Sequence, residues 1–335
     1  MGAAAARVGA AAARVGAVAA RTLNEPLTLR WDDITIGDWK KLLAKAPDSN
    51  IVLSWPAALA ALETHRKRPH FGVFYRGDIP AALVLASVKK SFLFERIAIH
   101  RGPLWLVPPT PDDEVAALRQ LANAWPAKRF RRVHLMPEMP NTPESHDLLK
   151  AAGYISLEKP PYKSVFLDIS QPLYNLEANF KKGWKSALSK SRKHNLTYTR
   201  DNTTPGFKLF LRGYRRDKTL KGYGGPSILF LLNMRKHARR EDMLLLEAWH
   251  EGELVAGQLF VTHGQSATYF VGWTTPQGRE VAAHNGLLYF ATEQLQKAGI
   301  KTLDMGGLAE NAPGLNKFKQ GLGGRTYELA GEWTR

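Results

Sequence analysis

The stretch HFGVFYRGDIPAALVL (residues 70–85) recurs in altered form as LLEAWHEGELVAGQLF (residues 245–260). Each copy reads as an apolar strand, a turn with a glycine and an acidic residue, and a second apolar strand, which is the pattern of a β-hairpin. Gly77 corresponds to Gly252, so the copies lie about half a chain apart in a sequence of 335 residues. Self-similarity of this kind predicts two similar halves.

The segments that follow the two hairpins also match. A helical pattern at residues 114–124 precedes a short strand at 132–136, and the second half repeats this order at 286–298 and 302–305. A hairpin, a helix and a strand in this order resemble the core of the GNAT acyltransferase fold. We therefore expect an α/β (α+β) protein of two tandem GNAT-like domains, each a mixed sheet flanked by helices.

Two adjacent prolines, Pro160 and Pro161, mark the expected boundary between the halves, because they block regular helix and favour an extended connector. We expect domain 1 over residues 27–163 and domain 2 over residues 164–335, with the last strand able to return to domain 1. Residues 1–26 form an Ala/Arg-rich low-complexity tail in which AAAARVG occurs twice. This tail has no large apolar face to dock, so we expect its removal to leave folding and activity intact.

Composition narrows the chemistry. The chain is 44% hydrophobic, enough for packed cores, and has no run of the ~18–20 apolar residues that a membrane-spanning helix needs. It has no Cys, and its His residues show no HxxH or HExxH spacing, so we expect no disulfide, no thiolate nucleophile and no metal site. The formal charge of +17 favours a polyanionic partner: nucleic acid, an anionic membrane surface or a phosphorylated small molecule.

The last part of the chain carries the most specific pattern. TLDMGG (residues 302–307) is followed by LNKFKQGLGG (residues 315–324). A strand, a double glycine and a Phe-Lys-x-Gly-x-Gly ending in this order resemble the Fem family of aminoacyltransferases, which usually has an aromatic residue where this chain has Leu322. The resemblance covers nearly the whole chain and is looser in domain 1.

Residues 179–196, NFKKGWKSALSKSRKHNL, resemble the basic helix of the same family. Their apolar members recur at helical spacing and are expected to form a buried stripe. These residues are Phe180, Trp184, Ala187 and Leu188. The remainder is basic, and Lys185 and Arg192 are candidate phosphate-binding residues. A solvated basic face is the alternative interpretation, and the spacing does not distinguish the two.

The resemblance implies a cytoplasmic enzyme of cell-wall synthesis that moves an aminoacyl group from aminoacyl-tRNA to an amine of a peptidoglycan precursor peptide. It implies charged tRNA as co-substrate and no further cofactor. Because the tRNA ester is already activated, such a protein mainly orients the amine and stabilises the developing oxyanion. By resemblance, Lys319 supplies the stabilising charge and Phe318 packs against the terminal nucleotide. For Lys319, an ordinary surface lysine is the alternative.

The acceptor implied by the resemblance is a UDP-linked or lipid-linked muramyl peptide, which presents phosphate and carboxylate groups. A lipid-linked acceptor would place the enzyme at the inner face of the membrane, in peripheral contact with it. Candidate contacts are Arg216 and Tyr223 in GYRRDKTLKGYGG (residues 213–225) and Tyr269 in TYFVGW. Arg101 is a further candidate, since Arg101-Gly102-Pro103 is similar to an Arg-Gly-Pro that follows a strand in the family.

Two other functions stay open. A CoA-dependent N-acyltransferase acting on a polysaccharide or lipid precursor would share the fold, but residues 277–286, QGREVAAHNG, lack the GxG spacing of a pyrophosphate-binding loop. A non-catalytic protein that binds tRNA or a membrane surface would explain the charge and leave the FKQGLGG ending unexplained. The amino acid transferred and the identity of the acceptor cannot be read from the sequence.

Overall fold

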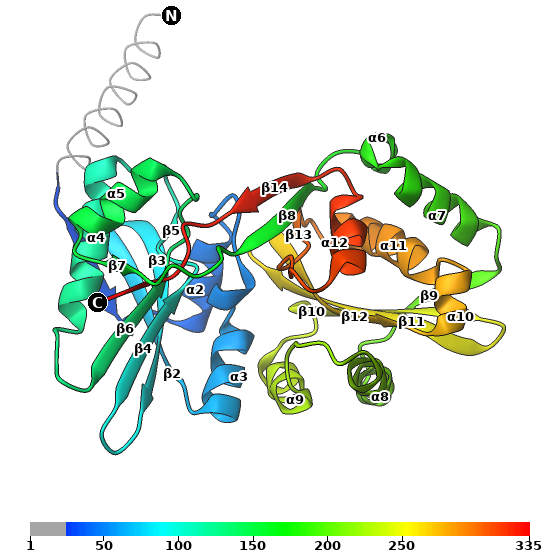
Figure 1. Cartoon of the computed structure of the whole chain (residues 1–335), viewed down its shortest axis with the longest axis horizontal. Coiled ribbons are helices and arrows are strands. Elements are labelled where there is room, and N and C mark those ends of the chain that lie inside the picture. The colour runs from blue at the N-terminus through cyan, green and yellow to red at the C-terminus, as the bar shows by residue number, and fades with distance from the viewer. Residues whose placement is uncertain (1–24) are drawn as a thin grey trace, which may run out of the picture.

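The structure is a computed structural model that describes residues 25–335. The predicted tail, residues 1–26, lies outside the described residues except for its last two. Two mixed β-sheets, each with helices on both faces, stand side by side (Figure 1). This confirms the predicted fold class and its tandem arrangement.

The first sheet has the strand order β1-β2-β3-β4-β6-β15-β7, with β5 paired to β3. Its strands are β1 (Leu27–Trp31), β2 (Arg68–Arg76), β3 (Ile79–Lys90), β4 (Glu95–His100), β5 (Leu104–Trp105), β6 (Arg131–Met136), β7 (Ile155–Ser156) and β15 (Trp333–Thr334). The helices of this half are α2 (Ile36–Leu43), the 3₁₀ helix η1 (Ile51–Leu53), α3 (Trp55–His65), α4 (Pro111–Ala124) and α5 (Pro143–Ala151). The helices α2 and α3 cover one face of the sheet, and α4 and α5 cover the other.

The second sheet has the order β14-β8-β13-β12-β11-β10-β9. Its strands are β8 (Lys163–Asp168), β9 (Leu196–Arg200), β10 (Met243–His250), β11 (Glu253–His263), β12 (Ser266–Thr274), β13 (Thr302–Asp304) and β14 (Arg325–Glu328). Its helices are α6 (Leu173–Asn179), α7 (Lys182–Arg192), α8 (Thr204–Lys221), α9 (Ile228–His237), α10 (Pro276–Glu280), α11 (Ala283–Lys297) and α12 (Pro313–Gln320). The helices α7, α11 and α12 lie on one side of this sheet, and α8 and α9 lie on the other (Figure 1).

The two halves repeat one topology. In the first, the hairpin β2–β3 leads through the antiparallel strand β4 and the helix α4 to β6, which runs parallel to β4. In the second, β10–β11, β12, α11 and β13 follow in the same order, with β13 parallel to β12. The predicted hairpins, helices and strands of both repeats are therefore confirmed.

The hairpin turns show why the repeat could be recognised in the sequence. Gly77 and Gly252 both have positive φ, at 59° and 81°, the region that glycine enters without steric cost. Each hairpin also has a register shift close to its turn, between Phe74 and Tyr75 in one and between Ala248 and Trp249 in the other. The turn and the apolar alternation are local features, so they stay visible in the sequence.

The predicted basic helix over residues 179–196 is shorter in the structure. Phe180 is extended, with ψ 140°, and α7 begins only at Lys182. The backbone N–H of Lys181 donates to the carbonyl of Gly321, 2.8 Å away, which draws the chain out of the helix. Three of the four predicted stripe residues are buried, and Ala187 is partly buried.

Several sets of contacts hold the two halves together. The helix α3 packs against α9, where Thr64 accepts a hydrogen bond from Asn233 and Glu63 pairs with Lys236. The ammonium of Lys40 binds Asp242 at 2.7 Å. The last strand, β15, crosses back from the second half to pair with β6 and β7 of the first sheet.

Among residues 25–335, no helix combines the length and apolar character required to cross a bilayer. Within the same residues, no cluster of His, Cys, Asp and Glu side chains could hold a metal ion.

Candidate active site

The second sheet opens between β12 and β13. The two strands pair only from Ser266 with Thr302 to Thr268 with Asp304. From Tyr269 onward, β12 continues without a partner on that side among the described strands, while the chain after β13 turns away through Gly306 and Gly307. The helix α12 packs at this opening, with Phe318 against the core cluster that includes Tyr269, Leu303 and Met305.

Asp304 fixes the double-glycine loop at this opening. Its carboxylate is buried and accepts hydrogen bonds from the Ser164 hydroxyl at 2.5 Å, the Gly306 N–H at 2.9 Å and the Tyr327 hydroxyl at 3.0 Å. Gly306 has φ 70°, and a Cβ there would lie 3.1 Å from the carbonyl oxygen of Tyr269. The glycine therefore lets the loop approach β12 closely.

Lys319 of α12 reaches into this loop. Its ammonium donates to the carbonyl of Gly306 at 3.1 Å and to the carbonyl of Gly307 at 2.7 Å. The residue is only 5% exposed, which rules out an ordinary surface lysine. Burial lowers the pKa of the Lys319 ammonium to about 8, against the opposing effect of the Asp304 carboxylate. An ammonium has three donors, so one N–H is without a protein partner among the described residues.

Aromatic rings gather around Phe318, the neighbour of Lys319 on α12. The ring of Phe318 lies 5.0 Å from the ring of His284, 6.0 Å from that of Trp184 and 6.3 Å from that of Tyr269. The indole N–H of Trp184 donates to the carbonyl of Phe318 at 3.1 Å, which ties α7 to α12. The predicted pair Phe318 and Lys319 is therefore brought together with Tyr269 around one opening in the sheet.

Tyr269 is held in one orientation by His284. The Tyr269 hydroxyl lies 2.9 Å from Nε2 of His284, and burial, followed by the charge of Lys221, lowers the pKa of His284 to about 4. The imidazole is therefore neutral near pH 7, and we assign its Nε2 as the acceptor of the Tyr269 proton. Gly272 makes room for this pair, because a Cβ there would lie 2.0 Å from the Tyr269 hydroxyl oxygen.

The end of α8 carries charged groups that influence Tyr269. Tyr223 donates to Asp217 at 3.0 Å, and Lys221 binds Asp217 at 2.6 Å. Burial and then the Asp217 carboxylate raise the pKa of Tyr269, and they do the same for Tyr223. The predicted residue Tyr223 therefore belongs to the electrostatic surroundings of Tyr269, and Arg216 lies exposed on α8 one residue before Asp217.

Of the other predicted site residues, Lys185 and Arg192 lie elsewhere, whereas Arg101 lies 3.9 Å from Asp304. Lys185 is exposed on α7 and donates to the carbonyl of Ala178 at 2.7 Å. Arg192, at the end of α7, binds both oxygens of Glu177 at 2.8 Å. Arg101 is 4% exposed and bound to Glu138 between the two halves of the molecule.

Asp304 and His284 were missed by the sequence analysis. Both lie in segments whose glycines were the basis of a prediction: Asp304 in TLDMGG and His284 in QGREVAAHNG. An acidic residue inside a short apolar strand was the available signal for Asp304. The contact of His284 with Tyr269 depends on the path of β12 into α11, and no spacing in the sequence encodes it.

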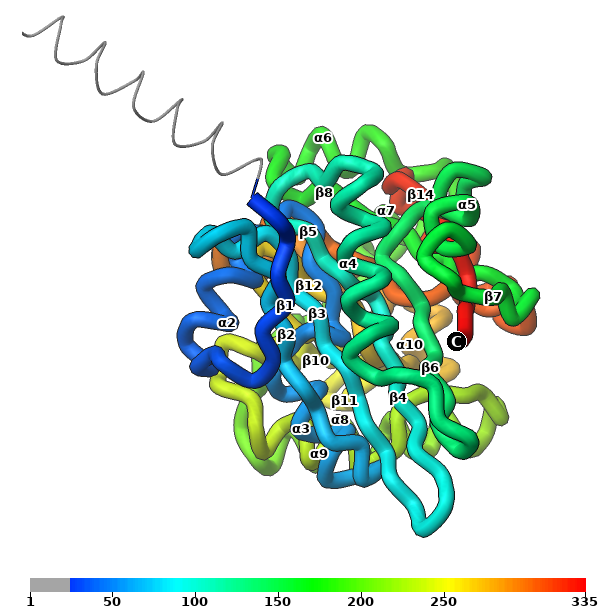
Figure 2. Tube along the Cα trace, turned by 90° about the vertical axis from the view of Figure 1, so that its left-hand side faces the viewer, coloured from blue at the N-terminus to red at the C-terminus, as the bar shows by residue number. Residues whose placement is uncertain are grey.

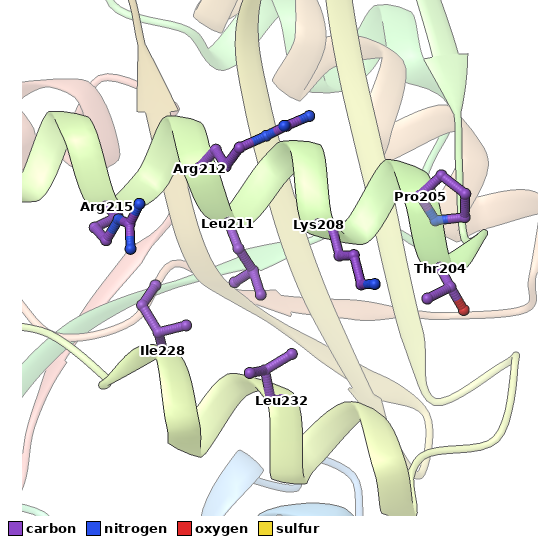
Figure 3. Close-up of a pocket in the computed structure, with 8 residues that line it drawn as sticks. All are labelled: Thr204, Pro205, Lys208, Leu211, Arg212, Arg215, Ile228 and Leu232. Carbon is purple, nitrogen blue, oxygen red and sulfur yellow. The ribbon is translucent and has the colours of Figure 1, made fainter.

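A groove runs along the outer side of α8, between that helix and α9 (Figure 3). It has a volume of about 640 Å³ and an apolar floor that includes Leu211, Ile228 and Leu232. Lys208 and Arg215 are among its lining residues. Since α8 lies on the opposite side of the sheet from α12, this groove is separate from the opening around Lys319.

Glu247 is a second titratable group buried in this half. It is 2% exposed on β10, and its Oε1 has no hydrogen-bond partner among the described residues. Burial, followed by the Asp201 carboxylate, raises the pKa of Glu247 to about 7. Glu247 therefore keeps its proton up to a higher pH in the folded protein than in the unfolded chain.

Glu247→Gln should stabilise the protein at neutral and alkaline pH. Because the folded pKa is raised, the penalty for ionising Glu247 grows as pH rises from about 4.5 to about 7 and is complete above that range. The gain at pH 8 should be on the order of 3 kcal/mol and should vanish near pH 4. Denaturant unfolding at both pH values measures it, and an equal effect at both would contradict the titration.

Comparisons with known proteins agree with this architecture. Residues 179–320 match the family model of the acetyltransferase (GNAT) domain. No curated protein matches the chain in sequence. Among solved structures, FemX is similar with a TM-score of 0.78 and 15% identity, covering 91% of this chain and 96% of its own.

Two further structures share the fold less closely. The C-terminal domain of a putative lysylphosphatidylglycerol synthetase from Agrobacterium fabrum has a TM-score of 0.54 at 11% identity, covering 90% of this chain and 92% of its own. A tandem GNAT protein from the clavulanic acid biosynthesis pathway has a TM-score of 0.50 at 14% identity, covering 92% of this chain and 98% of its own. The chain therefore has the tandem GNAT fold seen in FemX, and its second half is a GNAT-type acyltransferase domain.

Proposed function

We propose that this acyltransferase moves an aminoacyl group from aminoacyl-tRNA to an amine of a peptidoglycan precursor peptide. The observation that carries the proposal is the buried ammonium of Lys319, which has two donors bound to loop carbonyls and a third without a partner among the described residues. The likeness to FemX and the resemblance of the FKQGLGG ending to the Fem family support the same reaction.

The proposed reaction needs no nucleophile from the protein. The acceptor amine attacks the ester carbonyl of the aminoacyl-tRNA, so that a C–N bond forms and the carbonyl oxygen becomes an oxyanion. The third N–H of Lys319 stabilises that oxyanion. The amine then loses a proton, the C–O bond breaks, and the terminal ribose hydroxyl of the tRNA leaves with a proton.

The local structure argues against an acyl-CoA donor. A pyrophosphate loop presents free N–H groups at a helix N-terminus. Here the equivalent segment folds into α10, and the N–H groups of Gly278, Arg279, Val281 and Ala282 all bind oxygens of the segment itself. These amides of the α10 turn are therefore already used.

Transfer assays with two donors test the proposal. The protein is incubated with a UDP-linked or lipid-linked muramyl peptide and either total tRNA charged with labelled amino acids or labelled acetyl-CoA. We expect label to reach the peptide amine from charged tRNA alone. Transfer from acetyl-CoA, with none from tRNA, would establish the CoA-dependent alternative.

Turnover should depend on the protonated form of Lys319. With a pKa of about 8, the ammonium is mostly charged at pH 7 and is lost as pH rises through 8. The rate of the chemical step should therefore fall above about pH 8, measured by single-turnover kinetics. A rate that keeps rising to pH 9.5 would indicate that neutral Lys319 acts as a base instead.

Donor binding should weaken steeply with salt. Exposed ammonium groups on and near α7, those of Lys182, Lys190, Lys193 and Lys317, make no ion pair with another described residue. If four phosphates are neutralised, the affinity for tRNA should fall about 100-fold between 50 and 200 mM salt. Lys182→Glu should reduce the slope of the logarithm of the affinity against the logarithm of the salt concentration by about one. Lys150→Glu on the distant helix α5 is the control and should leave the slope unchanged (Figure 1).

A further inference from the structure

The hairpin that joins β3 to β4 ends in an exposed apolar tip. Phe92 is 100% exposed, Leu93 55%, Phe94 52% and the neighbouring Phe130 39%. These four residues are called the apolar tip below. Large apolar side chains gathered at one exposed place are unusual on a folded protein and mark an interaction surface.

The turn holds these side chains outward. The backbone N–H of Ser91 donates to the carbonyl of Phe94 at 2.8 Å, and the Ser91 hydroxyl donates to the same oxygen at 3.2 Å. The ring of Phe94 meets the ring of Phe130 edge to face at 5.5 Å. Phe92 and Leu93 therefore occupy the corner of a closed turn, and Figure 2 shows this hairpin, in cyan, projecting beyond the neighbouring loops.

Cations surround the apolar tip. The flanking segments read KKSFLFER (residues 89–96) and KRFRR (residues 128–132). Their single carboxylate, Glu95, is bound by Arg131 at 2.5 Å and by Lys90 at 3.3 Å. Lys89, Lys128 and Arg132 are exposed and make no ion pair with another described residue. The Lys and Arg residues of these two segments are called the cationic collar below, and their net charge is strongly positive.

We propose that the apolar tip and its cationic collar dock on the surface of an anionic lipid bilayer. A convex turn can push three apolar side chains below the headgroups while the long Lys and Arg side chains remain level with the lipid phosphates. RNA fits less well, because Leu93 offers no face for stacking and Phe94 is covered at its edge by Phe130. The inference is independent of the donor used by the enzyme.

Docking at this tip would bring the first domain to a membrane and leave the second domain free for its substrates. The tip lies at the end of the first sheet that is remote from α7 and α12 (Figure 1). Binding to vesicles can be measured without turnover, so failure of docking and failure of the proposed reaction are distinguishable.

Co-sedimentation of the full chain with vesicles tests the proposal. We expect binding to phosphatidylglycerol vesicles, little binding to phosphatidylcholine vesicles, and weakening by salt. The triple variant Phe92→Ser, Leu93→Ser, Phe94→Ser should bind phosphatidylglycerol vesicles more than about tenfold less tightly, since it removes the inserted apolar surface. Lys128→Glu with Arg129→Glu should weaken binding and reduce its dependence on salt.

Ile155→Ser is the matched control, because Ile155 is 69% exposed on β7 of the same domain and lies outside the tip. It should bind vesicles as the unaltered protein does. Unchanged vesicle binding by the triple variant would overturn the proposal. The proposal would also be overturned if the triple variant still bound vesicles but lost tRNA binding, or lost self-association as measured by sedimentation velocity.

Discussion

Lys319→Ala should lower turnover about 100- to 1000-fold, with little change in the KM for either substrate. The reason is that its third N–H meets charge that exists only in the transition state, while its other two donors already bind Gly306 and Gly307. Steady-state kinetics with charged tRNA and the muramyl peptide measure the effect. Loss of a ground-state contact would instead raise KM and leave turnover largely unchanged.

Burial makes the stability of this variant a necessary control. Removing the ammonium leaves the carbonyls of Gly306 and Gly307 without this donor, which can cost about 1–3 kcal/mol. The Ser164 hydroxyl also lies 2.9 Å from the Gly306 oxygen, but its one proton is shared with the Asp304 carboxylate. Lys319→Met keeps the aliphatic stem and should lose turnover to the same extent. Lys317→Ala removes one of the exposed ammonium groups proposed to bind the donor, two residues away, and should raise the KM for charged tRNA mildly at nearly full turnover. Equal losses for Lys317→Ala and Lys319→Ala through weaker donor binding would make Lys319 one member of a basic surface.

The features that could be predicted from the sequence are those set by neighbouring residues. Alternation of apolar residues around Gly77 and Gly252 is enough to specify two hairpins, and their recurrence is enough to specify a tandem fold. Helical spacing of apolar residues is likewise a local pattern, and it predicted the apolar side of α7. It failed at the start of that helix, because the bond from Lys181 to Gly321 joins segments 140 residues apart and carries no local signal.

The site could be predicted only where a motif pointed to it. Phe318 and Lys319 came from the resemblance of their segment to the Fem family, but the burial of Lys319 follows from its contacts with Gly306 and Gly307. His284 reaches Tyr269 because the short helix α10 turns the chain back after β12, so that α11 begins beside that strand. Contacts between residues around the opening between β12 and β13 depend on the tertiary structure, so composition and periodicity do not reveal them.

Arg101→Met should destabilise the protein by about 3–5 kcal/mol in denaturant unfolding, because it leaves buried carboxylates without their cation. Arg101 donates to both oxygens of Glu138, lies 3.9 Å from Asp304 and stacks over Tyr162 with its guanidinium carbon 5.0 Å from the ring centroid. Asn50 also donates to the Arg101 carbonyl at 2.9 Å. The guanidinium thus links the first half of the molecule to the carboxylate that orders the double-glycine loop.

Arg192→Met is the matched control for Arg101→Met. Arg192 also binds a glutamate through two bonds and lies over a tyrosine, but its side chain is 50% exposed, so the loss should stay below about 1 kcal/mol. Adding Glu138→Met to Arg101→Met should recover part of the stability, because the unpaired carboxylate is removed with its partner. If Arg101 instead binds substrate, Arg101→Met would raise the KM for the acceptor at unchanged stability, and Glu138→Met would restore nothing.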